Sequence, residues 1–419
     1  MLLHTETGIK TLFGPPPLRV ALVAFLFSAA GTAAMIAMPF FVFNQLGRGV
    51  VVSGIYSGTQ ALGYTLFALL SAPFVGRAKN GLRWGVMGVT GFMILIGVMS
   101  FSQNIVLCGV FYAGAFSISA LAWPSFHSWV GTEPDLQLRA CSMGRLNVGW
   151  STGGAAGPFV AGPLYEYDYR FAFAFVILLC LFSLYLILTI PNEKDYFQNK
   201  IVETSSEPAA YNQRSEVFLW CAWCATFTAH ICVGATRFIY PKILENIIDS
   251  GSLRFFMEKE PLYWLNSAAA TRFSWLMFIC GLGTAVLFLV LGRSTWWHHR
   301  FSLLVIAQLL TGISMFVLGF TSSLLLMLVA FSIIGANLGV AFFSSVYYGM
   351  ANVSLKHRRS SINEGVVGAG GIVGSFGFSF AGAALGLKMP FLWMPVFMVA
   401  VIFFQLQLIR LKEKNHKIA

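Results

Sequence analysis

The sequence predicts an all-α polytopic membrane protein with twelve transmembrane helices in two pseudo-symmetric six-helix bundles. Composition is the first observation, because 57% of the 419 residues are hydrophobic and only 10% are charged. Soluble domains carry about 25% charged residues. The second observation is a series of long apolar runs, each close to the ~20 residues that a helix needs to cross a bilayer. The third is a partial repeat between the two halves. The lipid bilayer is therefore the predicted environment.

Twelve apolar runs reach the required length. They cover residues 18–46, 51–75, 84–101, 105–130, 141–164, 171–190, 217–240, 268–291, 301–320, 322–350, 361–385 and 391–409. The polar stretch between the sixth and seventh runs is too short for a soluble domain. The predicted organisation is an N-terminal bundle at 1–190, a cytoplasmic linker at 191–216 and a C-terminal bundle at 217–419.

The formal charge of +11 predicts an orientation rather than a nucleic-acid partner. Cytoplasmic segments of membrane proteins carry an excess of Lys and Arg. If the N-terminus is inside, the outer segments hold eight of the 27 Lys and Arg residues, which leaves nineteen for the inner segments. Both termini are therefore predicted to be cytoplasmic. The compact length and short tails are typical of a bacterial cytoplasmic (inner) membrane protein.

The two halves share a pattern when the chain is shifted by 220 residues. The shift aligns Arg139 with Arg359, Gly154 with Gly374, Gly157 with Gly377, Ala161 with Ala381 and Gly162 with Gly382. Repeated bundles are typical of alternating-access transporters, whose substrate site lies at the interface of the repeats.

The fifth run carries the most specific motif. It reads Gly-Trp-Ser-Thr-Gly-Gly-Ala-Ala-Gly-Pro-Phe-Val-Ala-Gly-Pro-Leu from Gly149 to Leu164. Glycines four residues apart form a smooth stripe that lets two helices approach closely, and Pro158 removes a backbone N–H donor. The predicted packing residues are Gly149, Gly153, Gly157, Pro158 and Gly162. The run resembles the antiporter motif of the major facilitator superfamily, with Ala161 in place of one glycine.

That resemblance covers nearly the whole chain and implies the twelve-helix fold, but the gating loop departs from the family pattern. In the loop between the second and third runs, Ala78 stands where the family has Asp. The loop between the eighth and ninth runs, at 292–300, is more degenerate still. Glu364, at the inner end of the eleventh run, has Arg359 or Arg145 as a candidate partner. The predicted gating residues are Lys79, Gly81, Arg83, Arg139, Arg359 and Glu364.

The resemblance also implies which helices line the cavity, and polar or aromatic residues near their midplane are the candidate substrate contacts. The predicted set is Thr32, Gln60, Ser117, Asn147, Trp150, His230, Trp275 and Asn337. His230 is a candidate proton carrier because histidine titrates near neutral pH; the alternative is a packing residue. Asn337 either contacts substrate or makes an interhelical hydrogen bond, since a buried amide needs a partner.

All sixteen Asp and Glu residues fall in predicted loops or at helix ends. This argues against a cation-specific drug–proton antiporter, because nothing at the midplane would balance a buried cation. Arg237 and Arg272 lie near outer helix ends, where they either attract an anionic substrate or extend to the membrane interface.

Motifs for catalysis and nucleotide binding are missing from the sequence, and we expect neither an enzyme nor a cofactor or catalytic residue. Cys221 and Cys224 have CxxC spacing, but they lie in an apolar helix without a second pair, so we expect no metal. The predicted function is a secondary transporter, an exporter or exchanger of a small organic solute, with H⁺ or Na⁺ as a possible coupling ion. We expect a monomer. Alternatives are an uptake carrier for a neutral or weakly anionic metabolite, and a non-transporting scaffold or receptor.

Overall fold

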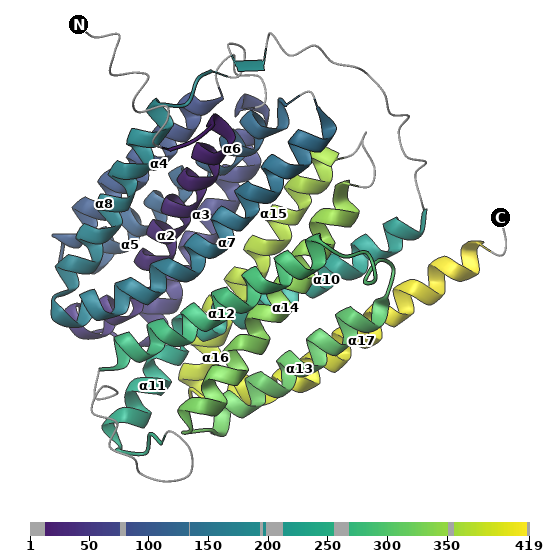
Figure 1. The fold of residues 1–419 in the computed structure, drawn as a ribbon. Coiled ribbons are helices and arrows are strands. Elements are labelled where there is room, and N and C mark those ends of the chain that lie inside the picture. Colours follow the sequence, from purple (N-terminus) through teal and green to yellow (C-terminus); the bar gives the residue numbers. More distant parts are fainter. Residues whose placement is uncertain are drawn as a thin grey trace, which may run out of the picture. The chain divides into compact units, whose positions relative to one another are not determined.

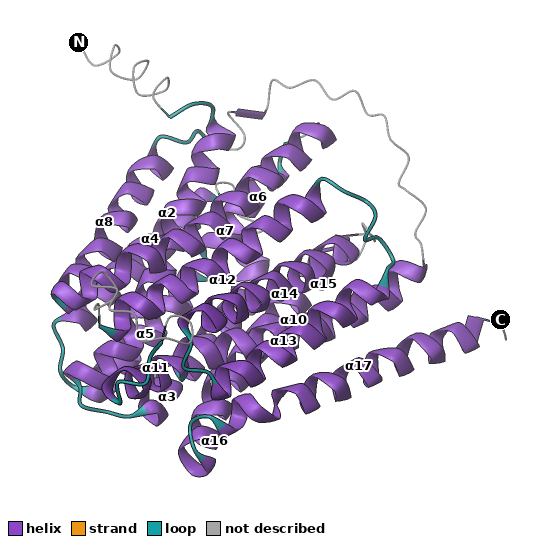
Figure 2. Ribbon diagram, turned by 60° about the horizontal axis from the view of Figure 1, so that its bottom comes forward, coloured by secondary structure: helices purple, strands orange, loops and turns teal. Residues whose placement is uncertain are grey.

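The computed structural model describes residues 13–75, 81–133, 135–192, 196–197, 213–254, 268–350 and 356–416. These residues form helices joined by short loops (Figure 2). One isolated β-bridge among the described residues pairs Arg254 with Ser323. The predicted all-α class is confirmed. The chain divides into two compact units, which we describe separately: unit 1 is Met1–Ala37 with Gly63–Ser206, and unit 2 is Met38–Leu62 with Glu207–Ala419.

Unit 1 contains most of the helices from the first half of the chain (Figure 1). They are α2 (Pro16–Phe40), α3 (Val50–Val75), α4 (Leu82–Ser100), α5 (Ile105–Ser119), α6 (Ala122–Gly131), α7 (Leu136–Tyr167) and α8 (Tyr169–Leu188). The end of α2 from Met38 onward, the π-helical turn η1 (Phe41–Gln45) and the first part of α3, as far as Leu62, belong to unit 2 instead. The side chain of Asn104 caps α5 by accepting hydrogen bonds from the N–H groups of Val106 and Leu107.

Unit 2 contains the remaining helices. They are α10 (Gln213–Phe238), α11 (Tyr240–Asp249), α12 (Ala269–Gly292), α13 (Phe301–Phe320), α14 (Leu324–Met350), α15 (Lys356–Ile372), the π-helical turn η3 (Val373–Gly377), α16 (Phe378–Leu385) and α17 (Met389–His416). The segment from the first half of the chain packs into this unit. The rings of Phe40 and Phe273 lie 5.9 Å apart, and the Ser53 hydroxyl donates to the carbonyl oxygen of Phe238 at 3.4 Å.

Ten of the described helical segments are long and apolar enough to cross a membrane. Two predicted spans are missing from these ten, although α3 and α7 are long enough, with 26 and 32 residues. The reason is composition. The α7 segment is rich in Gly, Ser and Thr and carries Arg139 and Arg145, and α3 includes Gln60 among several small polar residues. Both helices have a low mean hydropathy because they present small or polar faces.

Two helices differ in extent from the apolar runs. The predicted span at 105–130 is two helices, because the chain turns at Ala120–Leu121 between α5 and α6. The predicted span at 217–240 continues through α11, so the apolar segment runs from Ser215 to Asp249. Pro241 stands in the first turn of α11, where its missing N–H costs nothing. The predicted domain boundaries at 190 and 217 fall beside residues outside the described ranges and remain a prediction.

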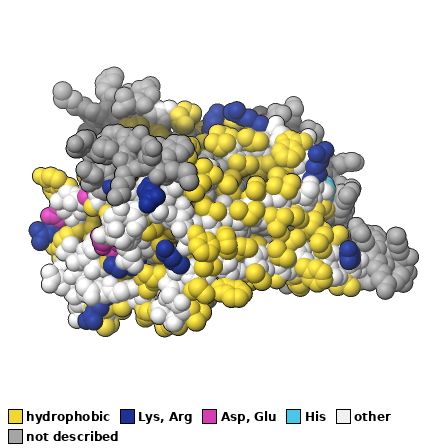
Figure 3. Space-filling view, turned by 90° about the horizontal axis from the view of Figure 1, so that it is seen from below, with side chains coloured by type: hydrophobic (Ala, Val, Ile, Leu, Met, Phe, Trp, Pro, Cys, Tyr) yellow, Lys and Arg dark blue, Asp and Glu magenta, His cyan; other side chains and the backbone are white. Residues whose placement is uncertain are grey.

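Large apolar side chains are exposed along the helices of both units. Leu70 and Val106 in unit 1 are 67% and 71% exposed, and Ile313 and Trp393 in unit 2 are 57% and 62% exposed. Figure 3 shows hydrophobic side chains over much of the visible face, with Lys and Arg toward its margins. Surfaces of this extent are unstable in water and suit contact with lipid. The protein is an integral membrane protein.

Candidate functional site

The predicted glycine stripe of α7 packs directly on the backbone of α2 within unit 1. A Cβ atom added at Gly149, Gly153 or Gly157 would collide with the carbonyl oxygen of, respectively, Ala21, Phe25 or Ala29. The three contacts advance by four residues on each helix, so the two backbones touch over two turns. Pro158 and Gly162 are also buried. Only glycine permits this approach, because every other residue would force the helices apart.

Unit 2 contains the equivalent contact between its own helices. A Cβ atom at Gly370 of α15 would meet the carbonyl oxygen of Phe227 in α10, and one at Gly374 in η3 would collide with that of Ile231. These two contacts have the same four-residue spacing as the contacts of Gly149, Gly153 and Gly157 in unit 1. The shift of 220 residues read from the sequence remains a prediction.

Two of the four predicted substrate contacts in unit 1 form hydrogen bonds within their own helices. The Thr32 hydroxyl donates to the carbonyl oxygen of Ser28 at 2.9 Å, and the Ser117 hydroxyl donates to that of Ala113 at 2.8 Å. Ser117 also lies against Gly63 of α3. Asn147 and Trp150 are half-buried on α7. Their role in substrate binding remains a prediction.

His230 in unit 2 lies where three helices meet. Its Nδ1 atom is 2.8 Å from the carbonyl oxygen of Thr226 in α10, and its ring centre is 6.4 Å from that of Phe342 in α14. The third neighbour is α15, since a Cβ atom at Gly370 would come within 2.8 Å of the Cβ of His230. The ring is half-buried. His230 is therefore held in place by contacts and by one hydrogen bond to its own helix.

Buried polar atoms without partners lie on the same pair of helices. Asn337 of α14 is 2% exposed, and its Nδ2 atom has no hydrogen-bond partner among the described residues. The hydroxyl of Thr226 in α10 is fully buried and likewise unpartnered within the described part of the chain. Asn337 stands one turn before Ala341, which packs with Ala222 of α10 in a buried cluster. An unsatisfied buried polar group costs about 1–3 kcal/mol.

The other two predicted contacts lie elsewhere in unit 2. Trp275 of α12 is half-buried, and Gln60 is 7% exposed on the part of α3 that belongs to this unit. Further along α12, Gly283, together with Gly335 and Gly339 of α14, brings these two helices into backbone contact. The Thr284 hydroxyl also donates across this contact to the carbonyl oxygen of Gly335 at 2.8 Å. The α12–α14 contact about two turns beyond Trp275 is thus closely packed.

The predicted gating residues divide into two groups. Arg359 forms an ion pair with Glu216 at the beginning of α10, so the suggested pairing of Arg359 with Glu364 is wrong. Glu364 itself is half-buried one and a half turns further along α15. The sequence could not distinguish the two carboxylates, because both lie near the same predicted membrane face. This ion pair ties the first turn of α10 to α15.

The remaining gating residues belong to unit 1. The Nε atom of Arg139 donates to the carbonyl oxygen of Glu133 at 2.6 Å, across the connection between α6 and α7. Gly81 is the N-terminal flanking residue of α4, and Arg83 is exposed. Lys79 lies outside the described residues.

The loop at 292–300, which departs from the family pattern in the sequence, is held against neighbouring helices by hydrogen bonds. Trp297 is 2% exposed, and its indole N–H donates to the carbonyl oxygens of Leu291 at 2.9 Å and Ser294 at 2.8 Å. His299 follows it in a left-handed backbone conformation with φ 56°. Its N–H donates to the hydroxyl of Tyr348 at 2.7 Å. Its Nε2 atom lies 3.2 Å from the hydroxyl of Ser215 in α10.

Sequence reasoning also missed a buried amide pair. Gln308 of α13 and Gln405 of α17 are fully buried, and Gln308 Nε2 donates to Gln405 Oε1 at 3.0 Å. Gln405 Nε2 donates in turn to the carbonyl oxygen of Cys221 in α10 at 2.9 Å. A glutamine inside an apolar run indicates a buried hydrogen bond, so the sequence contained a signal for this pair. It was missed because α13 and α17 are not among the helices that the resemblance expects to line the cavity.

Comparison with known proteins decides the family. The family model described as the Major Facilitator Superfamily matches residues 20–375. The chain belongs to this superfamily. By family and fold it is a membrane transporter, and members of the superfamily bind small-molecule substrates. No curated protein matches the chain in sequence.

Solved structures of other superfamily transporters share the fold at low identity. A bacterial homologue of the human lysosomal transporter Spinster, inward-facing and occupied, has a TM-score of 0.70 at 13% identity and covers 94% of this chain and 96% of its own. The nucleoside transporter NupG has a TM-score of 0.71 at 11% identity, with 94% and 99% covered. A POT family transporter in complex with 5-aminolevulinic acid has a TM-score of 0.68 at 15% identity, with 94% and 96% covered. Identities this low establish the shared fold alone.

Proposed function

We propose that this superfamily member is a secondary active transporter that exports or exchanges a small organic solute by alternating access. The observation that carries the proposal is the pair of equivalent glycine contacts, α7 on α2 in unit 1 and α15–η3 on α10 in unit 2. Backbone contact over two turns in unit 1, and over about one turn in unit 2, favours movement of each helix pair as one body. Two units stiffened in the same way support rocking of one bundle against the other.

The polar groups of unit 2 support a substrate that accepts and donates hydrogen bonds. Asn337 and Thr226 present buried groups without partners, and His230 is held beside Thr226 on α10. Binding of solute in a rearranged state of the unit would satisfy these groups. We assign Asn337, Thr226 and His230 to the substrate site on this basis.

Two buried or half-buried arginines favour the second candidate, an uptake carrier for a neutral or weakly anionic metabolite. Arg272 of α12 is 7% exposed, and Arg237 of α10 is half-buried and lies near the thiol of Cys280. Glu216 and Glu245 in this unit are already paired with cations. Because charges inside a membrane protein need compensation, the two arginines match an anionic solute better than a cationic one.

A thermal-shift screen of the purified protein in neutral detergent tests the proposal. A solute that binds only the folded protein at 100 times its Kd adds about 2.7 kcal/mol of apparent stability. Lipophilic amphiphiles that raise the unfolding temperature support an exporter, and hydrophilic metabolites support the uptake carrier. If sugars, organic acids, amino acids and lipophilic compounds all leave the transition unchanged, a non-transporting scaffold becomes the better account.

A further inference from the structure

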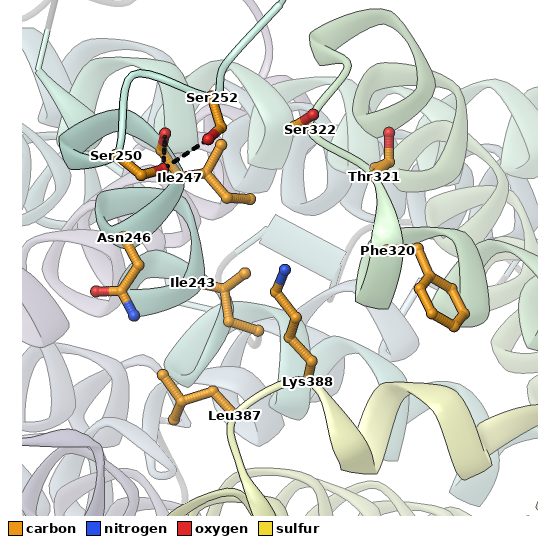
Figure 4. A pocket seen from close by; sticks show the side chains of 10 residues that line it. All are labelled: Ile243, Asn246, Ile247, Ser250, Ser252, Phe320, Thr321, Ser322, Leu387 and Lys388. Carbon is orange, nitrogen blue, oxygen red and sulfur yellow. Dashed lines mark hydrogen bonds between the residues drawn. The ribbon is translucent and has the colours of Figure 1, made fainter.

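A cavity of about 260 Å³ opens at one end of unit 2, away from the residues assigned to transport (Figure 4). Three connections of the chain surround it: the end of α11, the turn between α13 and α14, and the turn between α16 and α17. By the distribution of Lys and Arg this is the predicted external end. The cavity lies within a single unit, so its geometry needs no assumption about the other.

One cation, Lys388, projects into the cavity, and none of the described lining residues carries a negative charge. Figure 4 shows the side chain of Lys388 extending between the α11 end and the α13–α14 turn. Lys388 makes no ion pair with the described residues, and no Asp or Glu is among the ten residues that line the cavity. A positive group in a cavity without carboxylates favours an anionic ligand.

Neutral donors line the same cavity as Lys388. Ser250, Ser252, Thr321 and Ser322 contribute hydroxyl groups, and Asn246 contributes an amide. Hydroxyls and amides donate to phosphate and carboxylate oxygens without adding charge. The other lining residues are apolar: Ile243, Ile247, Phe320 and Leu387. The ligand that fits this lining has an anionic group with an apolar part of the same molecule beside it.

Hydrogen bonds fix the walls before any ligand arrives. The Ser250 hydroxyl donates to the carbonyl oxygen of Ile247 at 3.0 Å, and its oxygen lies 2.9 Å from the hydroxyl of Ser252, from which it can accept. On the other side, Arg254 N donates to Ser322 O at 3.0 Å, and Leu324 N donates to Arg254 O at 2.8 Å. The loop that follows α11 is thereby joined to the α13–α14 turn. Preorganised walls lower the cost of binding.

We propose that this cavity is an accessory binding site for a phosphate group, with Lys388 as its counter-ion. One ammonium group balances one negative charge, which matches a phosphodiester better than a doubly charged phosphate. The volume equals that of roughly nine water molecules at about 30 Å³ each, enough for a phosphate with a glycerol unit. An anionic phospholipid head group and a free phosphate solute share this chemistry.

Thermal unfolding of the full chain in neutral detergent tests the site, with three probes: short-chain phosphatidylglycerol, short-chain phosphatidylcholine and inorganic phosphate. The variants are Lys388→Gln and Lys388→Arg. The matched control is Arg170→Gln, which removes an exposed cation at the same predicted end of unit 1. We expect phosphatidylglycerol to raise the unfolding temperature of the wild type, Lys388→Arg and Arg170→Gln. Lys388→Gln should need at least about tenfold more lipid for the same shift.

The probes identify the source of the phosphate group. A response to phosphatidylglycerol without a response to inorganic phosphate assigns the site to lipid, and a response to both assigns it to free anions as well. Equal shifts in the wild type and Lys388→Gln with every probe would overturn the proposal, as would the absence of any shift in the wild type. Because the measurement requires no transport, its failure leaves the proposed function standing.

Discussion

Unit 1 and unit 2 hold two helices together by the same contact but differ in what lies beside it. In unit 1, Gly149, Gly153 and Gly157 occupy one uninterrupted α-helix, and the neighbouring Thr32 hydroxyl bonds to its own helix. In unit 2 the contact runs into the π-helical turn η3, and Thr226 and Asn337 keep buried groups without partners near it. The close helix packing is therefore common to both units. The buried Thr226 and Asn337 groups that lack a hydrogen-bond partner near this contact belong to unit 2.

The largest expected effect is loss of the glycine contact. Gly157→Leu in unit 1 and Gly374→Leu in unit 2 each push a side chain into the backbone of the neighbouring helix. Overpacking typically costs 1–3 kcal/mol, and we expect about 3 kcal/mol because a backbone cannot yield as a side chain does. Thermal unfolding should record the loss, and solute flux in proteoliposomes should fall at least about tenfold.

Each variant has a control on its own helix. Gly144 of α7 and Gly365 of α15 have no atom within 4 Å of an added Cβ. Gly144→Leu and Gly365→Leu should therefore keep nearly normal stability and flux. If the two control variants lose as much stability and flux as Gly157→Leu and Gly374→Leu, helix propensity rather than backbone packing explains the effect.

The ion pair between Glu216 and Arg359 should give the next largest effect. Arg359 is 5% exposed and Glu216 is 27% exposed. Removing one partner of a buried pair leaves an uncompensated charge and costs 3–5 kcal/mol; we expect about 2–3 kcal/mol here because Glu216 is partly solvated. Glu216→Gln and Arg359→Gln should each show this loss of unfolding free energy. The double variant should be more stable than either single variant, and additive losses would contradict direct pairing.

Asn337→Leu should separate stability from function. The Nδ2 atom of this amide has no partner among the described residues. Replacing the amide with an apolar group of similar size should raise the unfolding free energy by about 1 kcal/mol, while transport falls. The matched control is Ser345→Ala on the same helix, whose hydroxyl already bonds to the carbonyl oxygen of Phe342 at 2.8 Å. Retained flux in a stabilised Asn337→Leu protein would remove Asn337 from the substrate site.

The amide pair of Gln308 and Gln405 is expected to contribute a smaller amount. Interhelical hydrogen bonds inside membranes average about 0.6 kcal/mol, with a maximum near 1.7. Gln308→Leu leaves Gln405 with its bond to Cys221 and should cost about 1 kcal/mol. Thermal unfolding of both single variants and the double variant measures the coupling. A coupling of zero would show that the two amides act independently.

The smallest expected change is in the pH dependence of transport. His230 is fixed by Thr226 and packed against two further helices, which is typical of a packing or hydrogen-bonding residue. His230→Gln retains a hydrogen-bonding side chain, so we expect slower flux with a pH profile of unchanged shape. A flattened profile would instead identify His230 as the carrier of a coupling proton.

The sequence contains the periodic features of this fold. Apolar length predicts the membrane helices, and four-residue glycine spacing predicts the stripe from Gly149 to Gly157, because both properties are local along one helix. Pairings between distant segments are not local. Gln308 and Gln405 stand 97 residues apart, and Arg359 and Glu216 stand 143 apart. A sequence without covariation cannot select such partners.

Besides pairings between distant segments, turn geometry could not be predicted from the sequence. The loop at 292–300 lacks the family pattern, yet Trp297 and His299 fasten it to α12, α14 and α10 through hydrogen bonds. The loop depends on His299 in the left-handed region, which few non-glycine residues adopt and which the sequence pattern does not indicate. The cavity beside Lys388 is similarly invisible, because three separate turns build it.

The most direct test of transport is solute flux in proteoliposomes that contain the purified protein. The solutes are those that stabilise it in the thermal-shift screen, and Gly157→Leu and Gly144→Leu are measured alongside the wild type. We predict protein-dependent flux that is lost in Gly157→Leu and retained in Gly144→Leu. Flux that is absent for every stabilising solute, or equal in all three proteins, would contradict alternating access by two rigid units.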